Sequence, residues 1–123
     1  MFDIIFYEDK KGSSPVYDYL SKLKSTDNKD SRIKANKIQD YIQALSEYGT
    51  WIGEPYIKHL DGEIWELRPL RDRILFAAWN GDSFILLHHF KKKSQKTPIR
   101  EIKKAQNEYS DFKRRYQYEQ EQT

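Results

Sequence analysis

The amino-acid sequence predicts an α+β domain, in which helices pack on one face of a small antiparallel β-sheet. Two observations predict this class. Apolar residues recur at helical spacing near both ends of the chain, and three strand-like runs separated by turn residues lie between them. The chain has 123 residues, which suits one domain. We assign residues 1–116 to this domain and residues 117–123 to a polar tail.

The N-terminal part predicts one strand followed by a helical hairpin. A run of β-branched and aromatic residues at the start of the chain predicts a strand that ends near Tyr7. Ser14 and Pro15 are typical of a helix N-cap and a first helical position, and the apolar spacing after them predicts a helix that ends before residue 25. A second helix is expected over residues 30–48, where a glycine follows. The short polar link between them favours an antiparallel pair.

The central part predicts a meander of three strands after a short extended piece at residues 56–60. The three strands are expected at residues 63–69, 73–79 and 83–90. Asn80-Gly81 is one of the strongest hairpin signals that a sequence carries. A basic loop follows the last strand, and Thr97-Pro98 predicts the start of a third helix. The predicted order of elements is therefore β-α-α-β-β-β-α.

Strand alternation predicts which side chains share a face of the sheet. A four-residue turn at 69–72 sets Arg68 opposite Arg73, with Glu66 on the same face. Two neighbouring guanidinium groups repel, so this arrangement needs either Glu66 or a bound anion between them. The apolar residues of the two strands then pair on the other face, which we expect to be the core: Trp65 with Phe76, and Leu67 with Ile74.

The turn at Asn80-Gly81 decides which histidine joins the arginines. A two-residue turn aligns Arg73 with His88, whereas a three-residue turn changes the parity and brings His89 to that face. Both alternatives remain open from the sequence. In either case the loop from Lys91 to Lys96 adds further cations, so we expect a cationic pocket at this end of the sheet.

The positive charge is concentrated in this part of the chain. The whole chain carries 22 Lys and Arg against 19 Asp and Glu, a net charge of +3. Residues 58–104 alone hold 11 basic and six acidic side chains, a net charge of +5, and each flank carries −1. A local excess of this kind is expected of a protein that meets a polyanion at one face.

Several function classes are excluded by what the sequence lacks. It has no Cys, which excludes a disulfide scaffold, a thiol nucleophile and a Cys-ligated zinc site. No phosphate-binding glycine loop is present, and the adjacent His88 and His89 point to opposite faces of a strand, so we expect no metal site and no cofactor. No apolar run approaches the roughly 20 residues of a membrane span, and no leader pattern opens the chain, so we expect a cytoplasmic protein without membrane contact.

A cationic pocket with an imidazole could bind an RNA backbone and stabilise the added charge on a phosphorane. Arg and Lys perform that stabilisation, and His or a Lys with a lowered pKa can move the proton. Phe90 could stack on a base, with core packing as its alternative. The candidate catalytic residues are Arg68, Arg73, His88, Lys92 and Lys93. The candidate RNA-binding residues are Lys58, His59, Arg71, His89, Phe90, Lys91 and Lys96.

Two motifs in this region resemble the phage-derived branch of the RelE/HigB toxin superfamily. They are W-E-L-R at residues 65–68 and H-F-K-K-K-S-Q-K-T-P at residues 89–98, and the match extends over about 58–105. The resemblance implies a RelE-like fold and a toxin of a type II toxin–antitoxin pair. Such a toxin is an endoribonuclease that cleaves mRNA, usually in the ribosomal A site, and its partner is a small antitoxin, commonly a helix-turn-helix protein.

The resemblance also implies roles for individual residues. Arg68 and Arg73 fall on basic positions of the family's central strands, and Lys91 to Lys93 fall on the basic stretch after the last strand. These are the positions that carry phosphate binding and transition-state stabilisation in the family. The general base stays open between His88 and a lysine of 91–93, because neither Tyr116 nor Tyr118 aligns with the family's C-terminal base.

Two other functions are compatible with the sequence. The same scaffold occurs in toxins that bind and inhibit DNA gyrase, and a basic domain of this size could also be an RNA-binding module without catalysis. RNA cleavage with a cyclic-phosphate product separates the first hypothesis from both alternatives.

Overall fold

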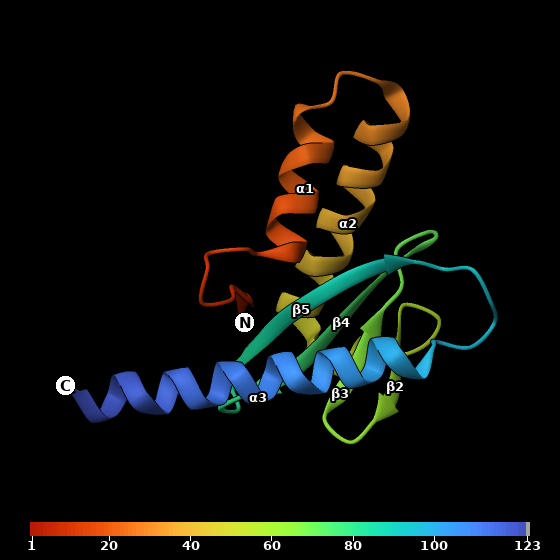
Figure 1. The fold of residues 1–123 in the computed structure, drawn as a ribbon. Helices are drawn as coiled ribbons and strands as arrows, with labels where there is room; N and C mark the ends of the chain where they lie inside the picture. The colour runs from red at the N-terminus through yellow and green to blue at the C-terminus, as the bar shows by residue number, and fades with distance from the viewer. Residues whose placement is uncertain (123) are drawn as a thin grey trace.

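The computed structural model describes residues 1–122 and has the predicted α+β class (Figure 1). It has one strand more than the predicted order of elements, because the extended piece expected at residues 56–60 is itself a strand. The elements are β1 (Asp3–Phe6), α1 (Pro15–Ser25), α2 (Lys29–Tyr48), the 3₁₀ helix η1 (Gly49–Ile52), β2 (Ile57–Asp61), β3 (Ile64–Leu67), β4 (Asp72–Trp79), β5 (Ser83–Lys91) and α3 (Ile99–Gln122). None of the helices in this part of the chain combines the length and apolar character needed to cross a membrane.

The five strands form one sheet in the order β1-β5-β4-β3-β2. The expected pairing of β3 with β4 is confirmed, since Trp65 pairs with Phe76 and Leu67 with Ile74. The sheet is mixed, however, because β1 lies parallel to β5, whereas the other neighbours are antiparallel. The chain between β1 and β2 forms the helical hairpin, so β1 reaches the sheet at the opposite edge from β2 and aligns with the last strand.

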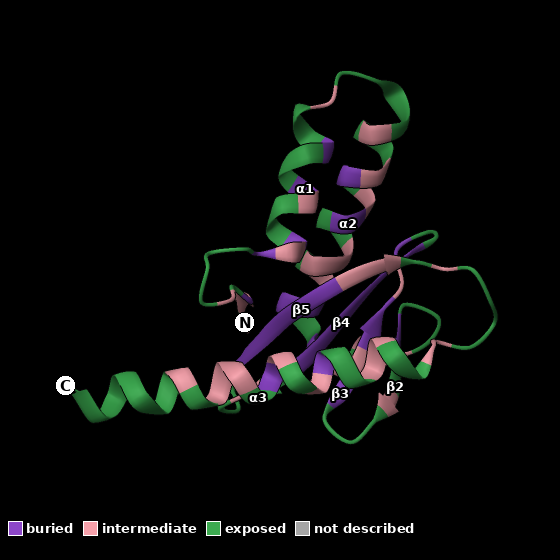
Figure 2. Ribbon diagram, in the orientation of Figure 1, coloured by how far each residue is buried: buried purple, intermediate pink, exposed green. Residues whose placement is uncertain are grey.

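Helices cover both faces of the sheet, which corrects the expectation of a single covered face. Ile74 and Phe76 of β4 pack in one cluster with α1 and α2, whereas Leu75 and Ala77 pack in another with Tyr109 of α3. Alternate positions of β4 are therefore apolar on both sides, as in strands that are buried on both faces. Figure 2 shows the buried strands between the hairpin and α3.

The helix starts follow the expected local signals in part. Ser14 is the N-cap of α1 and Pro15 its first residue, but the Ser14 hydroxyl donates to the Tyr7 carbonyl at 2.8 Å. The Asp18 carboxylate accepts from the Ser14 amide at 3.1 Å instead. α2 has a side-chain cap, because Asn28 accepts from the Ser31 amide at 2.8 Å.

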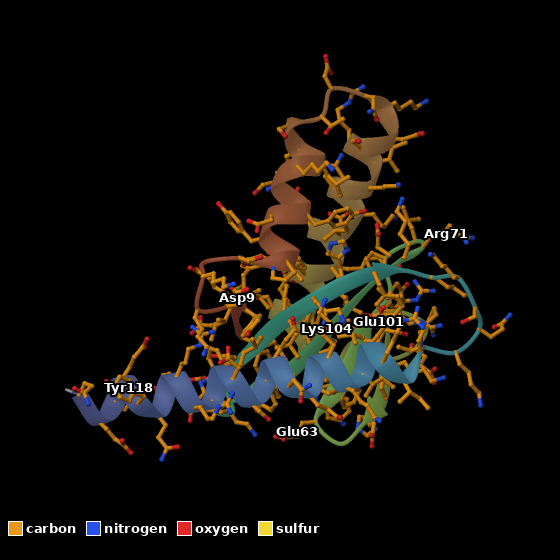
Figure 3. The ribbon with its side chains drawn as sticks, viewed as in Figure 1. Asp9, Glu63, Arg71, Glu101, Lys104 and Tyr118 are labelled. Carbon is orange, nitrogen blue, oxygen red and sulfur yellow. The ribbon has the colours of Figure 1, made fainter. Side chains whose placement is uncertain are left out.

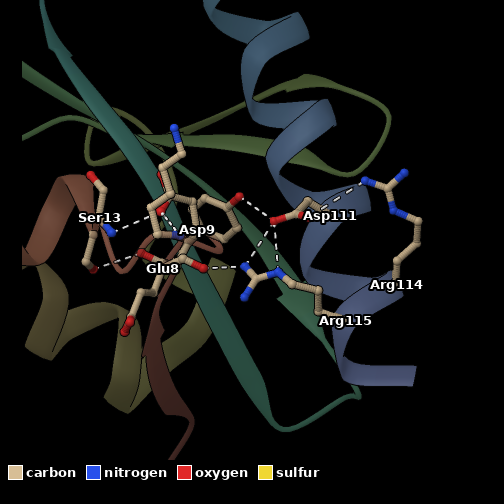
Figure 4. A network of polar contacts seen from close by, with 9 residues as sticks. Glu8, Asp9, Ser13, Asp111, Arg114 and Arg115 are labelled. Atoms are coloured by element: carbon tan, nitrogen blue, oxygen red, sulfur yellow. Dashed lines mark hydrogen bonds and ion pairs between the residues drawn. The ribbon is translucent and has the colours of Figure 1, made fainter. Parts of the chain in front are cut away.

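The C-terminal part of α3 is tied to the end of β1 by a polar network (Figure 4). The Tyr7 hydroxyl donates to Asp111 at 2.6 Å, and the Arg115 guanidinium donates to both Asp111 and the Glu8 carbonyl. Burial and the neighbouring Asp111 raise the pKa of Tyr7, and the hydrogen bond from Tyr7 lowers the pKa of Asp111. This network fixes where α3 crosses the sheet.

The segment that we assigned to a polar tail continues α3 as helix through Gln122. Its residues 117–122 are exposed and extend beyond the sheet (Figure 2). Thr123, the last residue of that expected tail, lies outside the described residues.

Candidate functional site

The connection between β5 and α3 encloses a cavity of about 310 Å³ at one end of the sheet. Figure 3 shows Arg71 at the end of the sheet where this connection begins, and Glu101 on the first turns of α3. The cavity brings together six of the candidate site residues: Arg73, Phe90, Lys91, Lys92, Lys93 and Lys96. The other residues that line it are Glu66, Ser94, Gln95, Thr97, Pro98, Arg100 and Glu101.

Glu66 is a buried carboxylate between the two arginines. Its Oε1 lies 3.5 Å from Arg68 Nε and 3.9 Å from Arg73 Nε, and its side chain is 2% exposed. The Thr97 hydroxyl donates to the other carboxylate oxygen. Of the two possibilities that the sequence left for the repelling arginines, the structure therefore has Glu66 between them. The hydrogen bond from Thr97 also ties the end of the basic loop to β3.

The Arg73 guanidinium is held by the backbone. Its Nη1 donates to the carbonyls of Leu70 and Asp72, both at 2.9 Å. Burial, and then the positive charge of Arg68, lower the pKa of Arg73 below its usual value. A cation that is held in place and partly stripped of water interacts more strongly with an anion than one in bulk solvent.

The turn between β4 and β5 is the three-residue alternative that the sequence left open, and it is combined with an irregular register. Three residues separate the paired Trp79 and Ser83, and the register shifts by one between Leu75 and Phe76. His88 consequently lies opposite Leu75 and Arg73 lies opposite Phe90, so the expected Arg73–His88 pairing is wrong. The additional turn residue alone would place His88 on the other face of the sheet. The register shift cancels this effect, so His88 points to the same face as Arg73, the face that α3 covers.

His88 lies beneath α3, outside the residues that line the cavity. Its Nδ1 is 2.5 Å from Glu108 Oε1 and its Nε2 is 3.1 Å from Glu101 Oε1, and the side chain is 1% exposed. Glu101 does line the cavity. The imidazole therefore contacts the site through this carboxylate.

His89 points to the opposite face, toward α1. Its ring stacks on Tyr19 at 3.9 Å between centroids, and the Tyr19 hydroxyl donates to Asp72 at 3.0 Å. Burial lowers the pKa of His89 from 6.5. Burial and Asp72 raise the pKa of Tyr19. His89 is thus separated from the cavity by the sheet.

Lys58 and His59 lie on the edge strand β2, beside another depression near Trp65. The His59 ring is 4.9 Å from the Trp65 ring, and its Nε2 is 2.7 Å from the Gly62 carbonyl. These two candidate RNA-binding residues do not line the cavity next to α3.

A further cationic cluster lies at the rim of the cavity. Arg71 and Lys92 are joined through their backbones, since the Lys92 amide donates to the Arg71 carbonyl at 2.8 Å. The Arg71 guanidinium donates to the Lys92 carbonyl at 3.3 Å. Contact with Lys34, and the repulsion between the two ammonium groups, lower the pKa of Lys91 from 10.5. Neighbouring cations of this kind favour an anion between them.

Sequence reasoning missed four residues of this region. Lys34 belongs to α2, and only the packing of the hairpin on β5 brings it to Lys91. Arg100 and Glu101 follow Thr97-Pro98, and the direction of the first turn of α3 places them at the cavity. Glu108 meets His88 from the third turn of α3. Glu101 had one signal, since it belongs to the segment that resembles the toxin family.

The arrangement combines a concave, cationic surface with few carboxylates. Five Lys and Arg side chains besides Arg73 line the cavity, against Glu66 and Glu101. Such a surface binds phosphates and stabilises charge that develops on them. Within residues 1–122, no group of three or more His, Cys, Asp and Glu side chains is arranged to hold a metal ion.

A known protein family matches this sequence. Its profile, described as "Phage derived protein Gp49-like (DUF891)", covers residues 20–110, which include β2 to β5, the basic loop and the first half of α3. No curated protein matches the chain.

Proposed function

Because the chain belongs to the phage-derived Gp49-like family, which is a RelE/toxin-like family, we propose that it is the toxin of a type II toxin–antitoxin system that cleaves mRNA. RelE-like toxins are ribonucleases. We further propose that the chain is of the HigB type, that cleavage needs no metal ion, and that the ribosome presents the message.

The observation that carries this proposal is the position of Arg73. The guanidinium is fixed by two backbone carbonyls and lines a cavity whose rim supplies Lys91, Lys92, Lys93 and Lys96. A phosphodiester in this cavity meets a rigid cation from the sheet and mobile cations from the loop. Fixed donors stabilise the phosphorane without reorganisation, which is the largest contribution available to a site without a metal ion.

The other candidate residues take supporting roles in this proposal. Arg68 acts through Glu66, which it contacts at 3.5 Å, and Phe90 lines the cavity where a base could stack. Lys58 and His59 would contact RNA beyond the cavity, along the edge strand β2. Single-stranded nucleic acid commonly follows such combinations of cations and aromatic rings.

Expression in cells tests the proposal. The unmodified chain should arrest growth and cut mRNA to fragments with 2′,3′-cyclic phosphate ends. Arg73→Ala should lower cleavage by about 100-fold or more, because it removes a fixed charge at the phosphorane. Since Arg73 is buried, the double variant Lys92→Gln/Lys93→Gln tests the same site at a half-buried and an exposed position, where a substitution disturbs the core less. Arg32→Ala, on the exposed side of α2, is the matched control.

Two outcomes would overturn the assignment. Equal growth arrest by all variants without message cleavage contradicts a ribonuclease at this site, and a DNA-damage response without RNA cleavage would support a gyrase inhibitor instead. RNA binding with no cyclic-phosphate product would support a binding module. Cleavage of free RNA at the rate seen with ribosomes would contradict ribosome dependence alone.

The toxin-like family also implies a cognate antitoxin. We propose a small helix-turn-helix protein encoded beside this chain. Coexpression of the neighbouring gene should restore growth, and the two proteins should copurify. A neighbouring gene that neither restores growth nor binds would contradict this partner.

A further inference from the structure

The cavity contains two carboxylates whose surroundings differ. Both oxygens of Glu66 are engaged, one beside Arg68 and Arg73 and the other by the Thr97 hydroxyl. Glu101 has only its Oε1 engaged at short range, by His88 at 3.1 Å. Its Oε2 has Arg100 Nε at 4.0 Å, and the Arg100 side chain is 77% exposed. Glu101 is therefore the carboxylate with an oxygen available to a ligand in the cavity.

We propose that Glu101 is the proton acceptor of the cleavage reaction, and that His88 and Glu108 are positioning residues that hold it from behind. This inference rests on the proposed ribonuclease function and names the group that starts the reaction. His88 cannot touch RNA, because its side chain is 1% exposed beneath α3. Glu101 connects it to the cavity, since its Oε1 contacts the imidazole and its side chain lines the cavity.

The reaction balances with groups that line the cavity. Glu101 Oε2 takes the proton of an RNA 2′-hydroxyl, and the 2′-oxygen forms a bond to the adjacent phosphorus. The bond from phosphorus to the 5′-oxygen breaks, and its electron pair leaves with that oxygen. An ammonium group of the loop, from Lys91, Lys92 or Lys93, supplies the proton that completes the 5′-hydroxyl. The products are a 2′,3′-cyclic phosphate and a 5′-hydroxyl, and no water is consumed.

The carboxylates on either side of His88 explain how Glu101 is held. Carboxylates accept hydrogen bonds, and His88 reaches one with each ring nitrogen: Glu108 Oε1 lies 2.5 Å from Nδ1, and Glu101 Oε1 lies 3.1 Å from Nε2. The ring sits in β5 and both carboxylates in α3, so the contact also presses the helix onto the sheet. Second-layer contacts of this kind orient a reacting carboxylate and set its proton affinity.

The charge around Glu101 comes from every element that packs on the cavity. The charged and titratable groups that face it are His88 of β5, Glu66 of β3, Arg73 of β4, Arg100 and Glu108 of α3, and the lysines Lys91, Lys92, Lys93 and Lys96. Cations outnumber carboxylates in this set, so a phosphate that enters the cavity beside Glu101 meets a net positive charge.

The experiment uses the purified full chain, an RNA oligonucleotide and ribosomes, with cleavage followed across pH. Glu101→Gln should lower the cleavage rate by about 100-fold or more and remove the acid limb of the rate profile. RNA affinity should stay within about twofold, because the variant keeps the shape of the side chain. Glu101→Ala should recover part of its rate when formate is added as an external base, which a purely structural role would not allow.

The positioning residues have a separate readout. Glu108→Gln should move the acid limb and lower the rate by about tenfold, since His88 then holds Glu101 less firmly. Glu63→Gln is the matched control, because Glu63 also joins the sheet to α3, through Lys113 at 3.4 Å, but lies outside the cavity. This control should leave the rate and the profile unchanged.

Each contrary result has a distinct meaning. If the unmodified chain does not cleave RNA, the proposed function fails and this inference fails with it. If the unmodified chain cleaves and Glu101→Gln cleaves with the same profile, the ribonuclease stands and Glu101 is not the base. Loss of cleavage in Glu101→Ala that formate does not restore, with an unchanged acid limb in Glu101→Gln, also overturns the role of Glu101.

Discussion

At the residue scale, the buried ionisable side chains beside the cavity lie in contact with complementary partners. Glu66 lies between Arg68 and Arg73, and His88 lies between Glu101 and Glu108. Burying a charge is costly unless a partner and hydrogen bonds compensate for the lost water. These contacts therefore compensate for the burial of ionisable side chains between the sheet and α3.

His89 makes the stability of the fold depend on pH. Burial lowers its pKa in the native state below the ordinary value of 6.5. As pH falls through 6.5, the unfolded chain binds a proton that the native state resists, so the free energy of unfolding should fall with pH. The contribution of His89 is complete above that value and is lost as pH falls toward the lowered native pKa.

The variant His89→Phe checks this prediction, because phenylalanine keeps the stacking on Tyr19 and does not titrate. Urea unfolding of both proteins between about pH 7.5 and about pH 5 should give a smaller fall in stability for the variant. Equal pH dependence in the two proteins would show that His89 does not contribute.

At the element scale, the ends of helices and strands decide the local geometry. Gly49, whose φ is 62°, is the C-cap of α2, and Gly53, whose φ is 67°, is the C-cap of η1. β5 contains the register shift that turns His88 toward α3. The basic loop leaves the sheet directly after β5 and is tied back to β3 by the hydrogen bond from Thr97 to Glu66. Each of these ends determines where the next element begins.

The two glycines predict different costs for the same substitution. A Cβ on Gly49 would lie 2.9 Å from the Phe2 ring, whereas a Cβ on Gly53 meets nothing nearer than 3.9 Å. Both substitutions suffer from the positive φ, but only Gly49→Ala also forces Phe2 to move. We expect about 1 kcal/mol of destabilisation for Gly53→Ala and about 2–3 kcal/mol for Gly49→Ala.

Urea unfolding at one pH measures this difference, and Gly53→Ala is the matched control for Gly49→Ala. The same cost for both variants would mean that the Phe2 ring relaxes without loss. In that case the close approach of β1 to the end of α2 would contribute nothing to stability.

At the scale of the whole molecule, the sheet separates two faces with different tasks. The α1–α2 hairpin builds most of one core, and α3 covers the other face and closes the cavity (Figure 1). The cations gather at the end of the sheet where β5 leaves for α3, and Lys34 and Arg71 extend them over the rim. A polyanion at this end would therefore contact the sheet, the loop and the hairpin together.

This distribution predicts how RNA binding depends on salt. Each phosphate contact on single-stranded RNA contributes about 0.7 to the slope of log affinity against log salt concentration. The double variant Lys92→Gln/Lys93→Gln should reduce the slope by about 1.4, if each lysine neutralises one phosphate. Fluorescence anisotropy with a labelled oligonucleotide, between about 50 and 200 mM salt, measures this slope.

The control replaces two lysines on α1, Lys22 and Lys24, which lie outside the cavity. It should leave the slope unchanged. An equal reduction by both double variants would indicate binding by net charge alone, without a preferred surface.

Much of the candidate site followed from the sequence. The features that did not follow depend on how separate strands lie relative to one another. Strand parity and the basic run after β5 predicted Arg73, Lys91, Lys92 and Lys93, and all four line the cavity. Lys58 and His59 lie elsewhere, because β2 is an edge strand at a distance from the β5–α3 loop. The shift between Leu75 and Phe76 also had no signal in the sequence, since an irregular pairing depends on both strands.

By itself, the sequence determined the fold class, the approximate positions of the three α-helices and the pairing of β3 with β4. These features depend on neighbouring residues, on alternation along a strand and on a short turn. Only the tertiary structure decided that β1 lies parallel to β5, that α3 covers the face opposite the hairpin, and that His88 meets Glu101 and Glu108. These contacts join segments far apart in the chain, and they form because both faces of β4 and β5 must be covered.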